Sequence, residues 1–301
     1  MNRRYALLAA VLAAAGLPGT QARGQDRPLQ TPDAQIVPTG TLRVQAGFDF
    51  LQSVQFPLSG LSGDLIDAGA LDLRLGVGRI AELQVQGTVE KFLQVNAEAP
   101  APVVPQLTGR NSTHDVGDFS LWTKLRLLGE HRAPGLAFRF GFEMPNSNQA
   151  RGIGNNATNV YASAIAEKHF GRLAAFGNAG VGILTSPNAK FSQNDVLIYG
   201  GAFTYQLLKR MRLAGEVAGR YSSRTITPAL AGTESRGQGR MGLVISAWGF
   251  DWDAAAVAGV YANDPSSGFT FGVSRDLKLF GRRGKGWRSR EGAGSPVGVQ
   301  E

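Results

Sequence analysis

Apolar and polar residues alternate with a period of two along most of this chain. In residues 41–51, Leu42 and Val44 fall on one face, and Arg43 and Gln45 on the other. Such alternation predicts a β-strand with one apolar and one polar face. The pattern recurs and predicts twelve strands, at residues 41–51, 69–78, 80–91, 118–128, 136–144, 158–168, 173–184, 196–207, 212–222, 236–248, 252–261 and 269–280. The facing of the sixth and seventh strands, which are rich in Ala and Gly, stays open, and we expect a bulge near residues 275–276.

The connections between these strands are alternately short and long. The short ones fall at residues 78–79, 129–135, 169–172, 208–210 and 249–251, and the longer ones at 52–68, 92–117, 145–157, 185–195, 223–235 and 262–268. Short periplasmic turns and longer outer loops are typical of bacterial outer-membrane barrels, which have an even number of strands. An open sheet edge in lipid would leave backbone groups unpaired, at several kcal/mol each. We therefore expect an all-β fold, a closed antiparallel transmembrane β-barrel of about twelve strands with up-and-down topology, in the bacterial outer membrane.

The two ends of the chain differ from this pattern. Arg3 and Arg4 precede a short apolar run, and small residues follow at 20–22, which predicts a secretory signal peptide over residues 1–22. The run is too short for a membrane-spanning helix. Residues 23–39 contain three prolines, and we expect a flexible periplasmic lead-in there rather than a plug inside the barrel. The barrel itself is predicted over residues 40–280, and a basic, disordered tail over 281–301.

Composition narrows the function classes. The absence of cysteine excludes a lipoprotein anchor and disulfide bonds. The net charge of +8 comes in large part from the leader and the tail. The strands lack a basic stripe, so we expect no binding of nucleic acid.

The polar faces of the strands carry charges of both signs. Two interpretations stay open: a salt-bridged lumen that fixes strand register, in which Glu82 and Arg126 are a candidate pair, or a solute path. A narrower candidate for an anion is the group Arg220, Arg224, Arg236 and Arg240. A twelve-stranded barrel favours a narrow or plugged path over a wide pore. The residues predicted to line the lumen and a possible substrate path are Arg43, Asp49, Arg74, Glu82, Trp122, Lys124, Arg126, Arg139, Glu143, Glu216, Arg220 and Arg240.

One stretch of the chain resembles a known family. Residues 115–118 (Asp-Val-Gly-Asp) open a strand, Pro134-Gly135 forms a turn, and the next strand closes with Glu143-Met144-Pro145. This order is similar to the outer-membrane proteins labelled "MetA-pathway of phenol degradation", although their Leu-Pro-Thr-Gly closing element is Met-Pro-Asn-Ser here. The resemblance implies a transporter that passes aromatic or other small hydrophobic compounds.

We therefore expect passive or facilitated passage of small hydrophobic or aromatic solutes, with outer-membrane lipid as the other partner and no cofactor. The alternative is a structural or ligand-binding barrel with a closed lumen and outer loops that bind a partner. An enzyme is not expected. Outer-membrane phospholipase A, a twelve-stranded barrel, needs a Ser and a His on its outer wall, whereas His114, His131 and His169 all fall in predicted loops or turns. A cation site at His114, Asp115 and Asp118 is possible, but turn formation explains these residues more simply. The sequence does not set the oligomeric state.

Overall fold

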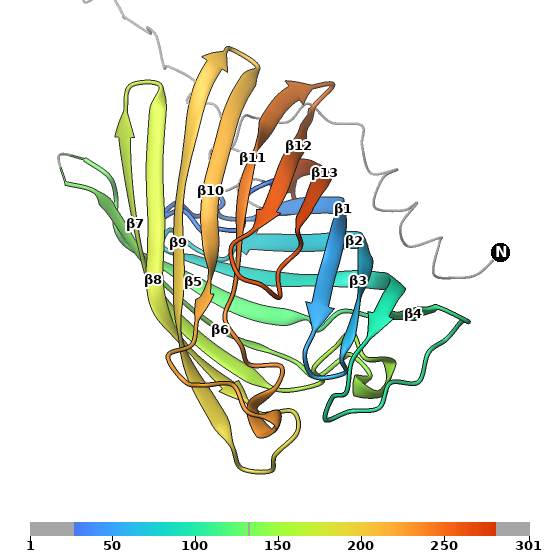
Figure 1. Cartoon of the computed structure of the whole chain (residues 1–301). Helices are drawn as coiled ribbons and strands as arrows, with labels where there is room; N and C mark the ends of the chain where they lie inside the picture. The colour runs from blue at the N-terminus through green and yellow to red at the C-terminus, as the bar shows by residue number, and fades with distance from the viewer. Residues whose placement is uncertain (1–26, 132, 281–301) are drawn as a thin grey trace, which may run out of the picture.

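A computed structural model describes residues 27–131 and 133–280 (Figure 1). It contains thirteen strands and two short 3₁₀ helices. The strands are β1 (Thr41–Phe56), β2 (Leu61–Gly76), β3 (Ala81–Glu98), β4 (Ser112–Asp115), β5 (Ser120–Leu128), β6 (Gly135–Glu143), β7 (Asn159–Phe170), β8 (Leu173–Thr185), β9 (Gln193–Leu208), β10 (Met211–Tyr221), β11 (Arg236–Ala247), β12 (Phe250–Gly259) and β13 (Ser267–Lys278), and the helices are η1 (Gln149–Arg151) and η2 (Pro228–Leu230). No helix among the described residues is long and apolar enough to cross a bilayer.

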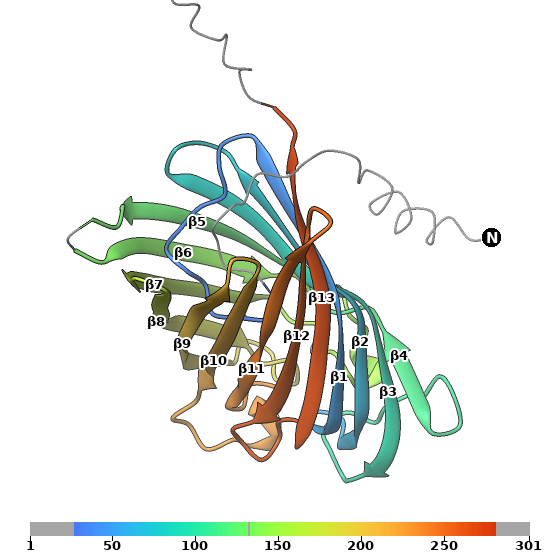
Figure 2. The ribbon, with the colours of Figure 1, turned by 90° about the horizontal axis from the view of Figure 1, so that it is seen from above.

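The strands form a closed ring in which neighbours are antiparallel (Figure 2). The ring closes between the first and last strands, where Thr41 lies opposite Lys278 and Gln52 opposite Ser267. This ladder runs without a register shift, so the bulge expected near residues 275–276 does not interrupt it. β4 is an additional short strand that pairs with β3 beyond the end of β5. The fold is thus a closed twelve-stranded barrel with one extra strand, which confirms the predicted fold.

The first three strands are longer than predicted, because bulges interrupt their alternation. The β1–β2 ladder shifts register at Gly47/Phe48 and between Leu51 and Val54. Gly69, with a φ of 69°, stands outside this ladder. An extra residue in one strand changes which side chains face inward. The long loop predicted at residues 52–68 is therefore wrong: strand continues to Phe56, resumes at Leu61, and leaves only residues 57–60 as a connection.

The outer surface is apolar, as lipid requires. Leu83, Phe138, Val160 and Ile245 have exposed side chains and alternate with inward-facing polar residues. Exposed aromatic side chains lie near both strand ends, at the short-turn end (Phe170, Trp248 and Phe280) and at the long-loop end (Phe92 and Tyr221). A closed sheet with such a belt is the architecture of an outer-membrane barrel. The protein is accordingly placed in the bacterial outer membrane, and the short turns are predicted to lie on the periplasmic side.

Residues 27–39 lie inside the barrel, which corrects the prediction of a flexible lead-in. Leu29, Thr31, Asp33, Ala34 and Val37 are all buried. Both ribbon views show this segment, in dark blue, passing inside the ring of strands (Figures 1 and 2). We call residues 27–39 the internal segment. The predicted signal peptide, residues 23–26 and the basic tail at 281–301 lie outside the described residues.

Candidate functional site

The first part of the internal segment is held by charged side chains of the wall. Nη2 of Arg27 lies 2.6 Å from Oδ1 of Asp49 on β1. Thr270 of β13 donates to the same oxygen at 2.6 Å. Arg240 of β11 lies 3.7 Å from Asp49 and donates to the carbonyl of Pro28 at 3.0 Å. Asp49 and Arg240, both predicted to face the lumen, therefore anchor the start of the segment.

Glu216 of β10 binds the backbone of the next two residues. Its carboxylate accepts from the amide of Gln30 at 2.7 and 2.9 Å and from the amide of Thr31 at 2.8 Å. The segment forms no strand or helix of its own here, so its buried amides need acceptors from elsewhere. Hydrogen bonds to a charged acceptor contribute about 1.5–3 kcal/mol each. Glu216 supplies these acceptors.

Two further carboxylates of the barrel wall bind the rest of the internal segment, which leads to β1. Glu167 of β7 accepts from the amide of Ala34 at 3.0 Å and from Nε2 of Gln35 at 2.9 Å. Glu82 of β3 accepts from the amide of Val37 at 2.5 Å. Three carboxylates on three separate strands thus fix the path of one irregular segment across the lumen.

Lys124 links the segment and the wall by ion pairs. Its Nζ lies 3.1 Å from Oδ1 of Asp33 and 3.4 Å from Oε1 of Glu82. Lys124 is the direct cross-strand neighbour of Glu82. The pair proposed from sequence between Glu82 and Arg126 is therefore wrong; Arg126 lies at the short-turn end and donates to the carbonyl of Arg79 at 2.8 Å.

A stack of arginine and aromatic side chains lies beside Lys124, on the same inward face of β5 and its neighbours. Arg139 donates to Oε1 of Gln84 at 2.9 Å and of Gln86 at 2.7 Å. Its guanidinium carbon is 3.8 Å from the centre of the Trp122 ring. Trp122 in turn stacks on Tyr161, with ring centres 5.4 Å apart. The predicted lumen residues Trp122 and Arg139 are thus brought together.

The remaining predicted lumen residues have partners close to them in the ladder. Arg43 pairs with Asp276 at 2.7 Å, and Arg74 with Asp72 at 2.5 Å. Glu143 accepts from Nδ2 of Asn159 at 2.8 Å. These contacts match the interpretation of a salt-bridged lumen.

The predicted arginine group does not form a single cluster. Arg220 and Arg236 lie opposite each other near the long-loop end. Arg220 donates to the carbonyls of Glu234 and Gly232 at 2.9 and 3.2 Å, and Arg236 pairs with Glu234 at 2.9 Å. Arg240 lies deeper, opposite Glu216, and Arg224 donates to the carbonyl of Gln193 at 2.8 Å. Each arginine therefore has its own acceptors.

Toward the long loops, two buried apolar clusters lie among charged groups such as Glu143, Arg220 and Arg236. One buried cluster combines inward-facing residues of β1, β2, β3 and β12 with Ile153, which follows η1. Its members are Leu51, Val54, Leu61, Leu65, Leu93, Val95, Ile153 and Val257. A second combines Tyr161, Leu184 and Val196, with Trp122 and Ile198 packed against them. The half of the lumen near the short turns is thus polar and filled by the internal segment, and the half near the long loops combines apolar clusters with charged pairs.

The residues at positions 114–118 stabilise turns rather than a cation site. Asp115 accepts from the amide of Asn148 at 2.5 Å, and Asp118 from the amide of Ser147 at 2.7 Å. His114 has Glu90 as its partner, with 2.8 Å between Nδ1 and Oε1. The considered cation site is therefore not assembled.

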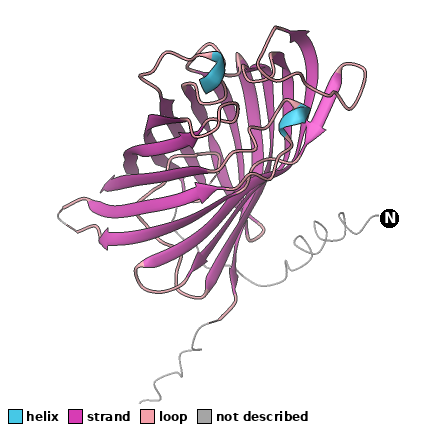
Figure 3. Ribbon diagram, turned by 90° about the horizontal axis from the view of Figure 1, so that it is seen from below, coloured by secondary structure: helices cyan, strands magenta, loops and turns pink. Residues whose placement is uncertain are grey.

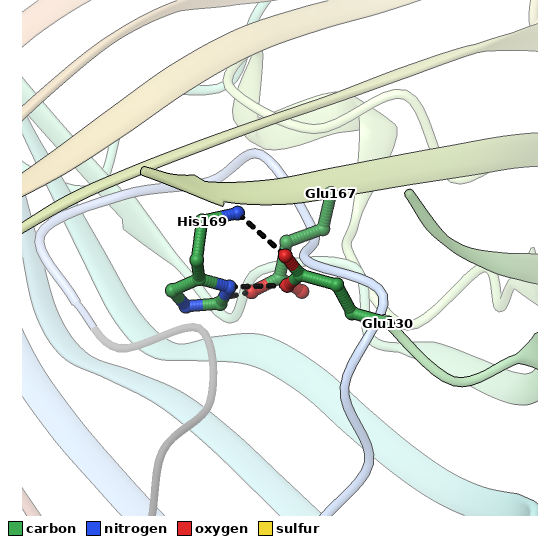
Figure 4. A group of neighbouring side chains, drawn as sticks. All are labelled: Glu130, Glu167 and His169. Atoms are coloured by element: carbon green, nitrogen blue, oxygen red, sulfur yellow. Dashed lines mark hydrogen bonds and ion pairs between the residues drawn. The ribbon is translucent and has the colours of Figure 1, made fainter. Parts of the chain in front are cut away.

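A second polar group lies at the short-turn end (Figure 4). Glu130, in the turn after β5, accepts from the backbone amide of His169 at 2.9 Å, and its Oε2 lies 2.5 Å from Nδ1 of the same residue. The backbone hydrogen bond from His169, with those from its ring and from Lys168, lowers the pKa of Glu130 to about 2. Glu130 is therefore a carboxylate throughout the physiological pH range.

Sequence reasoning missed the residues of the internal segment and the wall groups that hold them. Arg27, Asp33 and Glu167 were not among the candidates. The available signal was the isolated apolar residues Leu29 and Val37 among the prolines before the first strand, which suit a buried segment better than a solvated one.

No family model matches the sequence, and no curated protein matches it. Among solved structures, the COG4313 outer membrane channel from Pseudomonas putida F1 is similar with a TM-score of 0.58 and 16% identity, covering 83% of this chain and all (100%) of that one. The translocator domain of the autotransporter NalP from Neisseria meningitidis gives a TM-score of 0.47 and 11% identity, covering 90% and 94%. A FadL homologue from Pseudomonas aeruginosa gives 0.35 and 11%, covering 80% and 89%. The first of these likenesses supports the outer-membrane barrel fold, and the family noted at residues 115–145 stays a resemblance.

Proposed function

We propose that this protein is an outer-membrane channel for passive or facilitated passage of small hydrophobic or aromatic molecules. The observation that carries the proposal is the apolar cluster in the interior near the long loops, to which Leu65, Leu93, Val257 and Ile153 belong. The lumen of a water-filled barrel is polar. Apolar solutes, by contrast, leave water favourably for such a surface.

The aromatic stack supports the aromatic part of this proposal. Tyr161 belongs to the second apolar cluster with Trp122 packed against it, and Arg139 covers the Trp122 ring. Planar rings pair with such faces by offset stacking, which contributes about 0.5–1.5 kcal/mol beyond the area buried. We expect a solute with an aromatic ring to bind here better than one of equal size without a ring.

The internal segment is the barrier in this proposal. Residues 27–39 cross the polar half and are held by Glu216, Glu167 and Glu82. A solute that traverses the lumen needs the segment to move. Passage is accordingly expected to be selective and to depend on the freedom of this segment.

A disulfide lock tests the barrier, since the chain has no cysteine of its own. A Cβ atom built at Gly200 lies 2.8 Å from Oγ1 of Thr31, and the Asn178 side chain must move to admit it. The double variant Thr31→Cys with Gly200→Cys is therefore suited to join the segment to β9. The protein is reconstituted in liposomes, and swelling is followed in a phenyl glycoside and in the corresponding methyl glycoside.

We expect wild type and the reduced double variant to admit the phenyl glycoside faster than the methyl glycoside. Oxidation should slow entry of the phenyl glycoside at least fivefold in the double variant. It should leave the entry rate in the Thr31→Cys single variant unchanged. Equal rates for both glycosides would contradict the solute class, and insensitivity to oxidation would contradict the barrier. No entry of either solute in any state would favour the alternative, a closed structural or ligand-binding barrel with partner-binding outer loops.

A further inference from the structure

Three metal-ligating side chains converge at the short-turn end of the barrel. Glu130 comes from the turn after β5, and Glu167 and His169 from β7. Residues two apart on a strand share a face. One donor atom from each of the three residues lies within 4.8 Å of the others. Figure 4 shows the imidazole ring beside the two carboxylates. We propose that this group binds one divalent transition-metal ion, best suited by zinc.

The donor types fit this ion, and one pair of donors already has the spacing it requires. Zinc takes imidazole nitrogen and carboxylate oxygen at about 2.0–2.2 Å, and a tetrahedral ion therefore separates two donors by roughly 3.3 Å. Nε2 of His169 lies 3.4 Å from Oε1 of Glu167. A cavity of about 480 Å³ opens beside the group and is also lined by Gln35 and His131. Three protein donors and a water from this cavity complete four-coordination.

The surroundings already orient one ligand. Glu167 is buried, and its two oxygens accept from the amide of Ala34 and from Nε2 of Gln35. Carboxylates that bind metals are commonly held by such outer hydrogen bonds. A zinc ion on Glu167 would therefore connect the turn after β5, strand β7 and the internal segment.

The positive charge of Lys168 weakens the proposed zinc binding. Its Nζ lies 3.3 Å from Oε1 of Glu130 and donates to the carbonyl of His131 at 3.0 Å. A fixed ammonium group beside the site repels a divalent cation. Removal of this charge should tighten zinc binding, a result that a purely structural ion-pair cluster does not produce.

The test uses the full chain purified in detergent and washed with a chelator. Zinc chloride is titrated against a chromophoric chelator that competes for the ion. We expect one zinc per chain, at least tenfold weaker binding in His169→Ala and Glu167→Gln, and at least threefold tighter binding in Lys168→Met. His114→Ala is the matched control, because His114 also pairs with a glutamate but lies at the far end of the barrel. Folding of each variant is checked by the faster gel migration of the unheated barrel.

A second readout follows the internal segment. Zinc should slow hydrogen exchange of the Ala34 amide at least threefold in wild type and have no effect in His169→Ala. Less than one zinc per chain would overturn the proposal, as would equal losses in His169→Ala and His114→Ala or unchanged affinity in Lys168→Met. Neither readout depends on solute passage, so failure of the zinc proposal would leave the proposed channel function untouched, and the reverse also holds.

Discussion

At the scale of single residues, Lys124 shows how the interior is organised. Its side chain is 1% exposed and lies between Glu82 of the wall and Asp33 of the internal segment. Removing two opposite charges from water costs several kcal/mol, which their attraction offsets only with good geometry. Such a group contributes little net stability compared with apolar packing, but it fixes where the segment lies.

Replacing Lys124 with methionine should lower the free energy of unfolding by about 3–5 kcal/mol, because two buried carboxylates lose their partner. Adding Glu82→Gln should restore part of this loss, so that the double variant is more stable than the sum of the single effects. Urea unfolding in detergent, followed by tryptophan fluorescence, measures both quantities. Lys209→Met, at an exposed turn, is the control, and a Lys124 variant that unfolds like it would contradict the argument.

At the scale of elements, bulges decide which side chains face the lumen. Gly69 interrupts the β2 ladder with a φ of 69°. On its N-terminal side, Leu65 and Asp67 take the inward positions that Asp72 and Arg74 occupy on its C-terminal side. This switch brings apolar residues into the half of the lumen nearest the long loops.

Gly69→Ala should therefore destabilise the barrel by about 1–2 kcal/mol, since a left-handed backbone disfavours any Cβ. A Cβ there would also lie 3.1 Å from the side chain of Val89. Gly78→Ala is the matched control, because its φ is not positive and nothing lies within 4 Å of its Cβ. The difference between the two urea midpoints in detergent measures the effect, and equal midpoints would argue against a required bulge.

The same elements show what the sequence could reveal. Two-residue alternation located the twelve strands of the ring and the inward facing of Arg43, Lys124 and Glu216, because one face of each strand meets lipid. It did not reveal the extensions of β1 to β3, since a bulge breaks the period. It also missed the internal segment, because an irregular chain has no period and its partners, such as Glu167, are distant in sequence.

At the scale of the whole molecule, the two ends of the barrel are built differently. The short-turn end carries the group of Glu130, Glu167 and His169 and tight connections such as residues 209–210. The other end carries longer connections, at residues 99–111, 144–158 and 222–235. The second of these contains η1 and the third contains η2 (Figure 3). Because outer loops of such barrels are the longer ones, this asymmetry predicts that the long-loop end faces the cell exterior.

Orientation can be tested with trypsin on intact cells. Arg110 is exposed in the connection at 99–111, and Lys209 is exposed in the turn between β9 and β10. Both are cleavable residues, but only the first should face the cell exterior. We expect cleavage after Arg110 on intact cells and none at Lys209 or within residues 129–135, because the outer membrane excludes the protease from the periplasm. Permeabilised cells, in which Lys209 becomes accessible, provide the control. Cleavage at Lys209 with Arg110 spared on intact cells would show the opposite orientation, with Glu130, Glu167 and His169 on the outside of the cell.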